Sequence, residues 1–203
     1  KAVKASSGSG MFATGLTWFF EKENREQKVI YKDRNQFASD VEFVIENQFA
    51  PDCMCINRSI LDKYQFNAAL YINEDLELWG RIATEYPVTT IKENTAVLRV
   101  HSGNTSQTEK DYITPRIEVF EIQLANSEVR SQLSNTFIKN RWRSLRELSI
   151  RHQEATGNRW QLVFELIRFL TLYPRNPRNK AKLVTLIYNL PGGFLIKRIF
   201  GSE

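Results

Sequence analysis

An acidic pair, Glu74 and Asp75, follows Asn73 at the start of a segment with helical periodicity. Asn73 can cap the predicted helix, and helical spacing places Asp75 on its inward, apolar face. The apolar residues that define this face are Leu78, Trp79, Ile82, Ala83 and Tyr86. A carboxylate held there has restricted contact with solvent and a fixed direction, as a general base requires. A second interpretation stays open, because acidic residues are also common in first turns, where they complement the helix dipole.

Two further side chains of this segment are candidates for substrate binding. Trp79 lies four residues after Asp75 on the same helical face, where it forms either the wall of an acceptor pocket or part of the core. Arg81 projects from a different side of the helix, where it is placed to pair with Glu74 or Glu77. For Arg81 the alternatives are therefore a direct role in binding and an ion pair within the helix.

Longer stretches around this helix resemble a family 2 glycosyltransferase. The resemblance is carried by FN at 66–67, Leu70, NEDLELWGR at 73–81, YPV at 86–88 and RVHSGNTS at 99–106. The earlier NRSIL at 57–61 resembles the strand-to-helix element that precedes the motif in this family. The resemblance covers residues 1–110 and implies the second half of a GT-A domain. By position it implies that Asp75, beside Glu74, is the base that deprotonates an acceptor hydroxyl.

The resemblance also implies the reaction, which is transfer of a sugar from a nucleotide-sugar donor to a polysaccharide or lipid-linked acceptor with inversion. A sugar hydroxyl is a weak nucleophile, so a carboxylate within hydrogen-bond reach takes its proton as the nucleotide leaves. The leaving diphosphate needs cationic stabilisation, normally by a divalent cation such as Mg²⁺ or Mn²⁺. Arg99 and His101 lie in a polar segment where they are placed to contact the diphosphate, and His101 also its metal. The alternative is a pair that only stabilises the loop.

The donor-binding half of the family pattern is not found in this sequence. It has no opening hydrophobic strand with a nucleotide-binding loop and no D-x-D motif, and neither Asp33 nor Asp40 has a partner that would make one. The sequence SGSG at 7–10 lacks the Lys and the following helix of a phosphate loop. We therefore expect the donor-binding elements to lie upstream of Lys1 in a longer enzyme, and the 203 residues alone to be inactive.

The elements expected along the chain change in kind near residue 110. Before it, strands are predicted at 11–20, 29–31, 88–91 and 95–100, together with one in DCMCI at 52–56, and helices around 37–45, at 58–64 and after Asn73. After it, only helices are predicted, at 111–126, 128–154, 157–173 and 179–190. The predicted fold class is α/β for residues 1–110, with an all-helical C-terminal extension over 111–203.

Basic residues are concentrated at the end of the chain. The whole sequence has 28 Lys and Arg against 23 Asp and Glu, whereas residues 151–203 have nine against three. The apolar helix at 157–173 and the end PGGFLIKRIF at 191–200 combine hydrophobic area with cations, which predicts peripheral binding to an anionic membrane surface. Two rival functions stay open: a non-catalytic helical interaction module, and nucleic-acid binding by the basic tail, for which no recognised motif is present.

Composition and cysteine content fit an ordinary folded protein. Hydrophobic residues make up 42% of the chain and charged residues 25%, which argues against disorder and against a membrane bundle. On one strand, Cys53 and Cys55 would lie about 6–7 Å apart on the same face, too far for an unstrained disulfide. We expect both to be reduced core residues, and the protein to be cytoplasmic, at the inner face of the membrane where the tail binds.

Overall fold

The computed structural model describes residues 10–101, 103 and 112–190, and it divides the chain into two compact units. The N-terminal unit covers residues 1–137 and the C-terminal unit residues 138–203. The sequence placed this division after residue 110. The observed division comes later because α5 (Thr114–Ala125) packs on α3 (Glu74–Ile82) of the N-terminal unit. The protein belongs to the α/β class, with its sheet in the N-terminal unit.

The sheet is built around β1 (Met11–Phe20), which was expected from its run of apolar and aromatic residues. Along one edge β1 pairs in parallel with β4 (Val88–Val100) over its whole length. The other edge is shared by two short antiparallel strands, β2 (Arg25–Lys28) and β3 (Met54–Ile56). The strand predicted at 29–31 is wrong: the pairing of β2 with β1 ends at Lys28, and the Val29 N–H that follows donates to the Leu16 carbonyl at 2.8 Å.

The two strands predicted at 88–91 and 95–100 form one strand with an irregular centre. The pairing of β4 with β1 shifts on both sides of Gly15, which lies opposite Asn94. The Asn94 amide donates to the Leu16 carbonyl at 3.2 Å and to the Thr17 hydroxyl at 2.7 Å. A Cβ on residue 15 would lie 2.1 Å from the Asn94 side-chain oxygen, so this approach requires glycine. The side chain of Asn94 thus replaces part of the backbone pairing and lets the strand continue.

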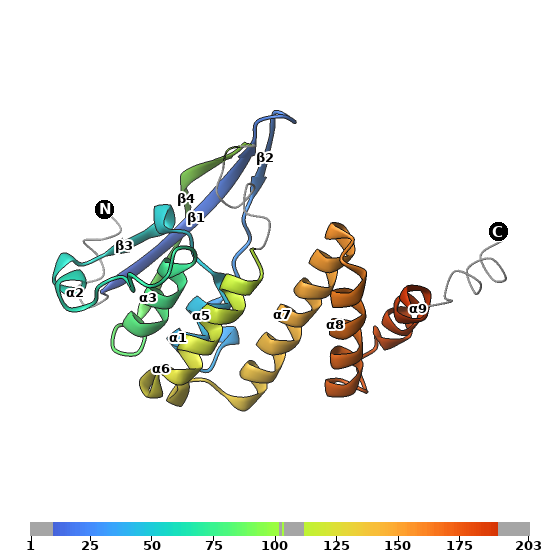
Figure 1. Cartoon of the computed structure of the whole chain (residues 1–203). Coiled ribbons are helices and arrows are strands. Elements are labelled where there is room, and N and C mark those ends of the chain that lie inside the picture. The colour runs from blue at the N-terminus through green and yellow to red at the C-terminus, as the bar shows by residue number, and fades with distance from the viewer. Residues whose placement is uncertain (1–9, 102, 104–111, 191–203) are drawn as a thin grey trace. The chain divides into compact units, whose positions relative to one another are not determined.

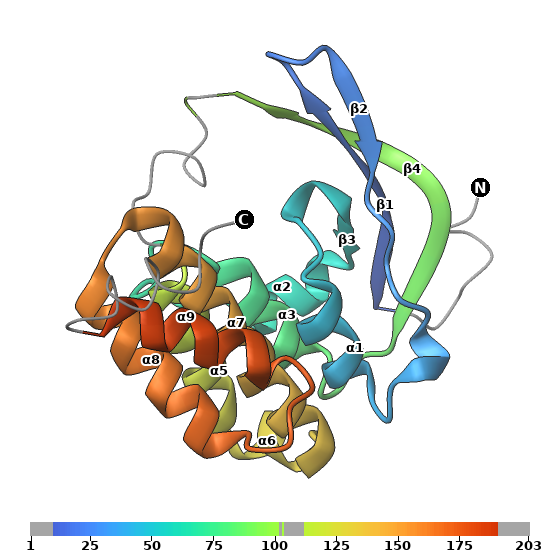
Figure 2. The same cartoon turned by 90° about the vertical axis from the view of Figure 1, so that its right-hand side faces the viewer.

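Helices α1 (Asp40–Asn47) and α3 lie on one face of this sheet (Figures 1 and 2). Helix α1 packs against α3, α3 against α5, and α5 against α6 (Ser127–Ser131). The short α2 (Arg58–Lys63) follows β3, and the described part of the N-terminal unit also contains the 3-10 turns η2 (Arg34–Gln36) and η3 (Pro51–Cys53). Its largest fully buried side chains include Phe43, Phe49, Leu78, Ile82 and Phe120. This core holds the start of α3 firmly against α5.

The two cysteines have different environments. Cys53 is buried at the end of η3, whereas Cys55 is exposed on β3. The prediction that both are core residues is therefore wrong for Cys55. The reason is that Cys53 belongs to a 3-10 turn, so the two residues do not follow the alternation of one strand. Both thiols are free, as expected.

The C-terminal unit is helical. Helix α7 (Asn135–Thr156) begins just before the division between the units, and α8 (Arg159–Leu172) and α9 (Asn179–Asn189) follow. The helices predicted at 111–126, 157–173 and 179–190 are confirmed to within a few residues, whereas the one at 128–154 is two helices, α6 and α7. The buried cluster of this unit consists of Ile150, Leu162, Leu166 and Phe169, with Tyr173 and Leu186 packed against it.

Two predicted features lie outside the described residues: the end PGGFLIKRIF, and most of the loop SGNTS that completes the second motif. No helix in the described part of the chain combines the length and the apolar composition needed to cross a bilayer.

Candidate functional site

The start of α3 has an unusual backbone. Asn73 precedes the helix in the left-handed region, with φ 63°, which asparagine tolerates better than most residues. Its side chain does not accept a hydrogen bond from the helix, so the predicted side-chain cap is wrong. Instead, the side-chain nitrogen is buried and has no hydrogen-bond partner among the described residues. A buried amide donor is therefore left beside the acidic pair.

The Asp75 carboxyl is partly buried and strongly perturbed. Burial raises its pKa from the ordinary 3.8 to about 6, and the nearby negative charge of Glu74 acts in the same direction. The backbone N–H of Leu76, 2.9 Å from the Asp75 Oδ1, and the positive charge of Arg116 act in the opposite direction. With a pKa just below neutrality, Asp75 is mostly ionised at pH 7 and has more affinity for a proton than an ordinary aspartate. These are the properties of a general base.

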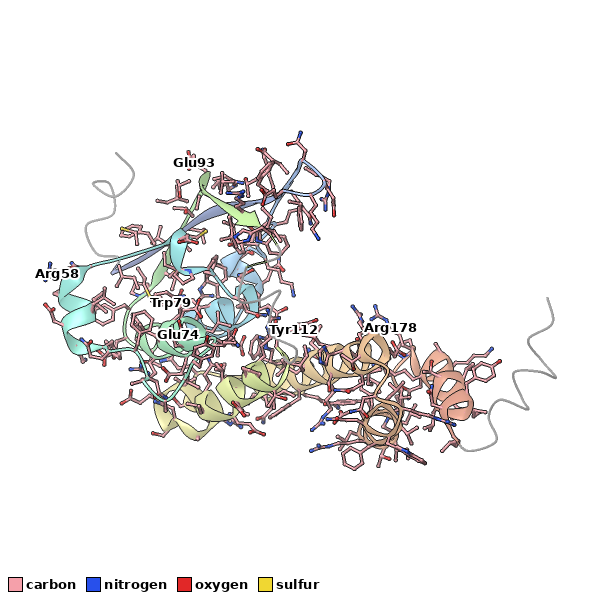
Figure 3. The ribbon with its side chains drawn as sticks, turned by 45° about the horizontal axis from the view of Figure 1, so that its top comes forward. Arg58, Glu74, Trp79, Glu93, Tyr112 and Arg178 are labelled. Atoms are coloured by element: carbon pink, nitrogen blue, oxygen red, sulfur yellow. The ribbon has the colours of Figure 1, made fainter. Side chains whose placement is uncertain are left out.

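Arg116 is the residue of this site that the sequence analysis did not identify. It lies in the first turns of α5, partly buried, and its guanidinium carbon is 5.8 Å from the centre of the Tyr112 ring. Burial lowers the pKa of Arg116, and the charges of Tyr112 and Asp75 raise it. Figure 3 labels Tyr112, just before α5, together with Glu74 and Trp79 of α3. In the sequence, the local pattern at Arg116 is an aromatic residue, Tyr112, four positions before it. Arg116 lies 41 positions after Asp75, and no sequence pattern indicates that it packs near α3.

A buried side chain fixes α5 against the helix that carries Asp75. The Gln123 amide of α5 donates to the Leu76 carbonyl at 2.8 Å. A Cβ on Gly80 would lie 2.9 Å from the Gln123 nitrogen, so the glycine makes room for this contact. One bond thus anchors the first turn of α3, immediately after Asp75, to the helix that carries Arg116.

The structure places Trp79 in the core. Its side chain is 4% exposed, its indole nitrogen donates to the Phe49 carbonyl at 3.1 Å, and its ring packs edge-on against Phe66. These contacts favour the core alternative over the wall of an acceptor pocket.

Arg81 forms the ion pair that was one of its two alternatives. Its guanidinium donates to both oxygens of buried Glu77, at 2.7 and 2.9 Å, and to the Gln65 carbonyl at 2.6 Å. The partner is Glu77 and not Glu74. Arg81 therefore holds the segment after α2 against α3.

Arg99 lies near the end of β4, opposite Phe19 of β1, and His101 directly follows the strand. Arg99 binds the carboxylate of Glu21, and this hydrogen bond lowers the pKa of Glu21 and raises that of Arg99. The His101 Nδ1 accepts the backbone N–H of Gly103 at 3.1 Å. Both contacts fit the loop-stabilising alternative.

Within the described residues, no three His, Cys, Asp or Glu side chains gather to hold a metal ion. The metal role of His101 stays a prediction. Of the sequence-derived candidates, the structure thus joins Asp75 and Glu74 to one site, to which it adds Asn73 and Arg116.

No protein-family model, no curated protein and no solved structure matches this chain. Its function is therefore inferred from its own residues.

Proposed function

We propose that this chain forms the acceptor side of an inverting glycosyltransferase with a GT-A fold, and that Asp75 is its general base. The observation that carries the proposal is the partly buried Asp75 carboxyl at the start of α3, whose pKa burial raises to about 6 and on which the more distant positive charge of Arg116 acts. A strongly perturbed carboxyl next to a specific charged partner is typical of functional sites. The resemblance of residues 1–110 to family 2 glycosyltransferases supplies the reaction class.

In this reaction the acceptor hydroxyl attacks the anomeric carbon of the donor sugar. Asp75 takes the hydroxyl proton as the new carbon–oxygen bond forms, and the bond from the anomeric carbon to the diphosphate breaks on the opposite face. The nucleoside diphosphate leaves with the bonding electron pair, and the configuration inverts. A divalent cation, when bound, would neutralise charge on the diphosphate. The described residues offer no ligand set for it, and no step is assigned to it.

The neighbours of Asp75 tune this proton transfer. Arg116 favours the ionised carboxylate, which limits the effect of burial and keeps the base ready at neutral pH. Glu74 acts in the opposite sense and strengthens the affinity of Asp75 for the proton. Asn73, whose buried side-chain nitrogen has no partner among the described residues, lies directly before this acidic pair.

The test is Asp75→Asn in the complete enzyme. Asparagine has nearly the same shape and still accepts the Leu76 N–H, but it takes up no proton at neutral pH. Turnover should fall by about 10²- to 10⁴-fold, while the dissociation constant of the donor changes by less than about threefold. In the wild type, kcat/KM should fall as the pH drops below about 6, because the base becomes protonated. The variant should lose this acid limb.

The matched control is Asp62→Asn, which changes an exposed aspartate of α2 and should leave turnover unchanged. Release of nucleoside diphosphate and the anomeric configuration of the product are measured on the same preparations. Near-wild-type turnover of the Asp75→Asn variant, or a product with retained configuration, would contradict the proposal.

A further inference from the structure

Helix α8 exposes large apolar side chains on the face opposite its core. Leu162, Leu166 and Phe169 are buried against the rest of the C-terminal unit. On the other side, Trp160 is 67% exposed, Phe164 59% and Ile167 50%. These three recur at spacings of four and three, so they form one stripe along the helix. The described residues of the C-terminal unit do not bury this stripe.

A cationic pocket lies at the C-terminal end of the same helix. It has a volume of about 240 Å³ and is lined by Leu172 of α8, by Lys139 and Arg143 of α7 and by Arg175 of the following loop. No carboxylate is among its lining residues. Lys139 and Arg143 are one helical turn apart, so their side chains project from the same face of α7. Guanidinium and ammonium groups arranged in this way fit a phosphate group.

The stripe and the pocket are continuous. Trp160, Phe164, Arg168 and Leu172 are successive members of one four-residue ridge of α8, all exposed, and the ridge ends at the pocket. The ridge and the pocket together contain four cations, Lys139, Arg143, Arg168 and Arg175, and no acid. The one acid of α8 is Glu165. That acid is turned inward, 3.7 Å from Arg146, with both side chains largely buried.

We propose that this part of the C-terminal unit, the α8 surface, binds anionic membranes. The α8 surface consists of Trp160, Phe164, Ile167, Arg168 and Leu172, together with the pocket cations Lys139, Arg143 and Arg175. The apolar stripe enters the boundary between headgroups and acyl chains, where tryptophan is favoured, and the pocket takes the phosphate of an anionic lipid.

The chemistry of the surface favours this occupant over others. A nucleic acid would meet the cations but would leave the aliphatic and aromatic stripe in contact with water. A second copy of the chain that docked by the same surface would bring like charges together, because the residues of the α8 surface include four cations and no acid. An anionic bilayer uses both the apolar area and the positive charge. This inference does not depend on the proposed glycosyl transfer.

Vesicle flotation of the 203-residue chain tests the proposal. The chain should bind phosphatidylcholine vesicles that contain about 30 mol% phosphatidylglycerol at least about tenfold more strongly than pure phosphatidylcholine, and salt should weaken the binding. The double variant Arg143→Gln/Arg175→Gln should bind the anionic vesicles about five- to thirtyfold more weakly. Trp160→Ser/Phe164→Ser should reduce binding to a similar degree, through loss of buried apolar area.

Matched controls change the same residue types elsewhere. Ile30→Ser/Val97→Ser removes two exposed apolar side chains of the N-terminal unit, and Lys28→Gln/Lys92→Gln removes two exposed cations. Both control proteins should bind the vesicles as the wild type does. Lipids brominated along the acyl chain should quench the tryptophan emission of the wild type, and Trp160→Ser should remove most of that quenching, which reports insertion even where affinity changes little.

Several results would overturn the proposal. Equal binding to neutral and anionic vesicles would exclude the cationic pocket as a binding site for lipid phosphate. Equal binding by the α8-surface variants and the control variants would exclude the α8 surface as the membrane-binding site. Binding of a short single-stranded DNA without vesicle binding would assign the cations to nucleic acid. A dimer that dissociates in Trp160→Ser/Phe164→Ser, without vesicle binding, would assign the stripe to self-association.

Discussion

The start of α3 and the exposed face of α8 depart from the usual distribution of side chains in opposite ways. At α3, an acid, an amide and a guanidinium are partly removed from water. At α8, Trp160, Phe164 and Ile167 are left in water. Buried polar groups and large exposed apolar patches are the informative exceptions to protein packing, because each costs stability.

The comparison also shows why burial of charge alone does not mark a site. Glu77 lies two residues after Asp75 and is more deeply buried, yet its two oxygens are fully paired with Arg81. Asp75 receives the backbone N–H of Leu76 and the more distant charge of Arg116, and no described cation binds its carboxylate directly. The carboxylate without a directly bound cation is the one available for chemistry. The two exceptional regions should therefore respond to different variables, α3 to pH and α8 to ionic strength.

Of the effects on stability, the largest is expected from Asp75→Asn. The folded-state pKa of about 6 lies above the unfolded value near 3.8, so the folded protein binds more protons between these values and loses stability as the pH rises through them. The shift corresponds to an upper limit of about 3 kcal/mol, and partial exposure lowers the expected cost to about 1–3 kcal/mol. Asparagine removes this cost, so the inactive variant should be more stable than the wild type at pH 8.

Urea unfolding at pH 8 and pH 5 measures this effect, and the difference between the two proteins should shrink at the lower pH. If Asp75 only supported the helix, its replacement would instead lower the unfolding free energy by about 0.5–2 kcal/mol. Vesicle binding should be the same for both proteins, because the two exceptional regions serve separate interactions.

Glu77→Gln should have the opposite sign and a smaller size. The change removes the charge that neutralises Arg81, but glutamine retains one hydrogen bond and Arg81 still donates to the Gln65 carbonyl. We expect a loss of about 1–2 kcal/mol in unfolding free energy. The acid limb of kcat/KM should not move, since Glu77 does not contribute to the pKa shift of Asp75. A displaced acid limb would show that the paired and unpaired carboxylates are coupled.

The sequence was sufficient for features that depend on local pattern. The apolar run of β1 and the helical spacing of α3 were identified correctly, and so was the inward position of Asp75. Where contacts between distant residues determine the structure, the sequence led to a wrong prediction or to none. It predicted two strands where Asn94 bridges the irregular pairing opposite Gly15, and it placed Cys55 in the core.

Arg116 shows the limit most clearly. Its proximity to Asp75 depends on the packing of α5 on α3, which the buried Gln123 and the space left by Gly80 make possible. A single glutamine within a helical pattern carries no signal of this kind. The sequence also divided the chain after residue 110, where the helices begin, although the first of these helices belongs to the core of the N-terminal unit.

The smallest expected effects come from the two charges that act on Asp75 from opposite sides, and their signs make the sharpest test of the α3 site. Glu74→Gln removes a negative charge that raises the pKa of Asp75, so the acid limb of kcat/KM should move to lower pH. Arg116→Gln removes a positive charge that lowers it, so the limb should move to higher pH. A structural role of either side chain would change the amount of folded enzyme but not the position of the limb. Complete pH profiles of both variants against wild type decide the matter, and displacement of the two limbs in the same direction would show that Asp75 is not the group that titrates.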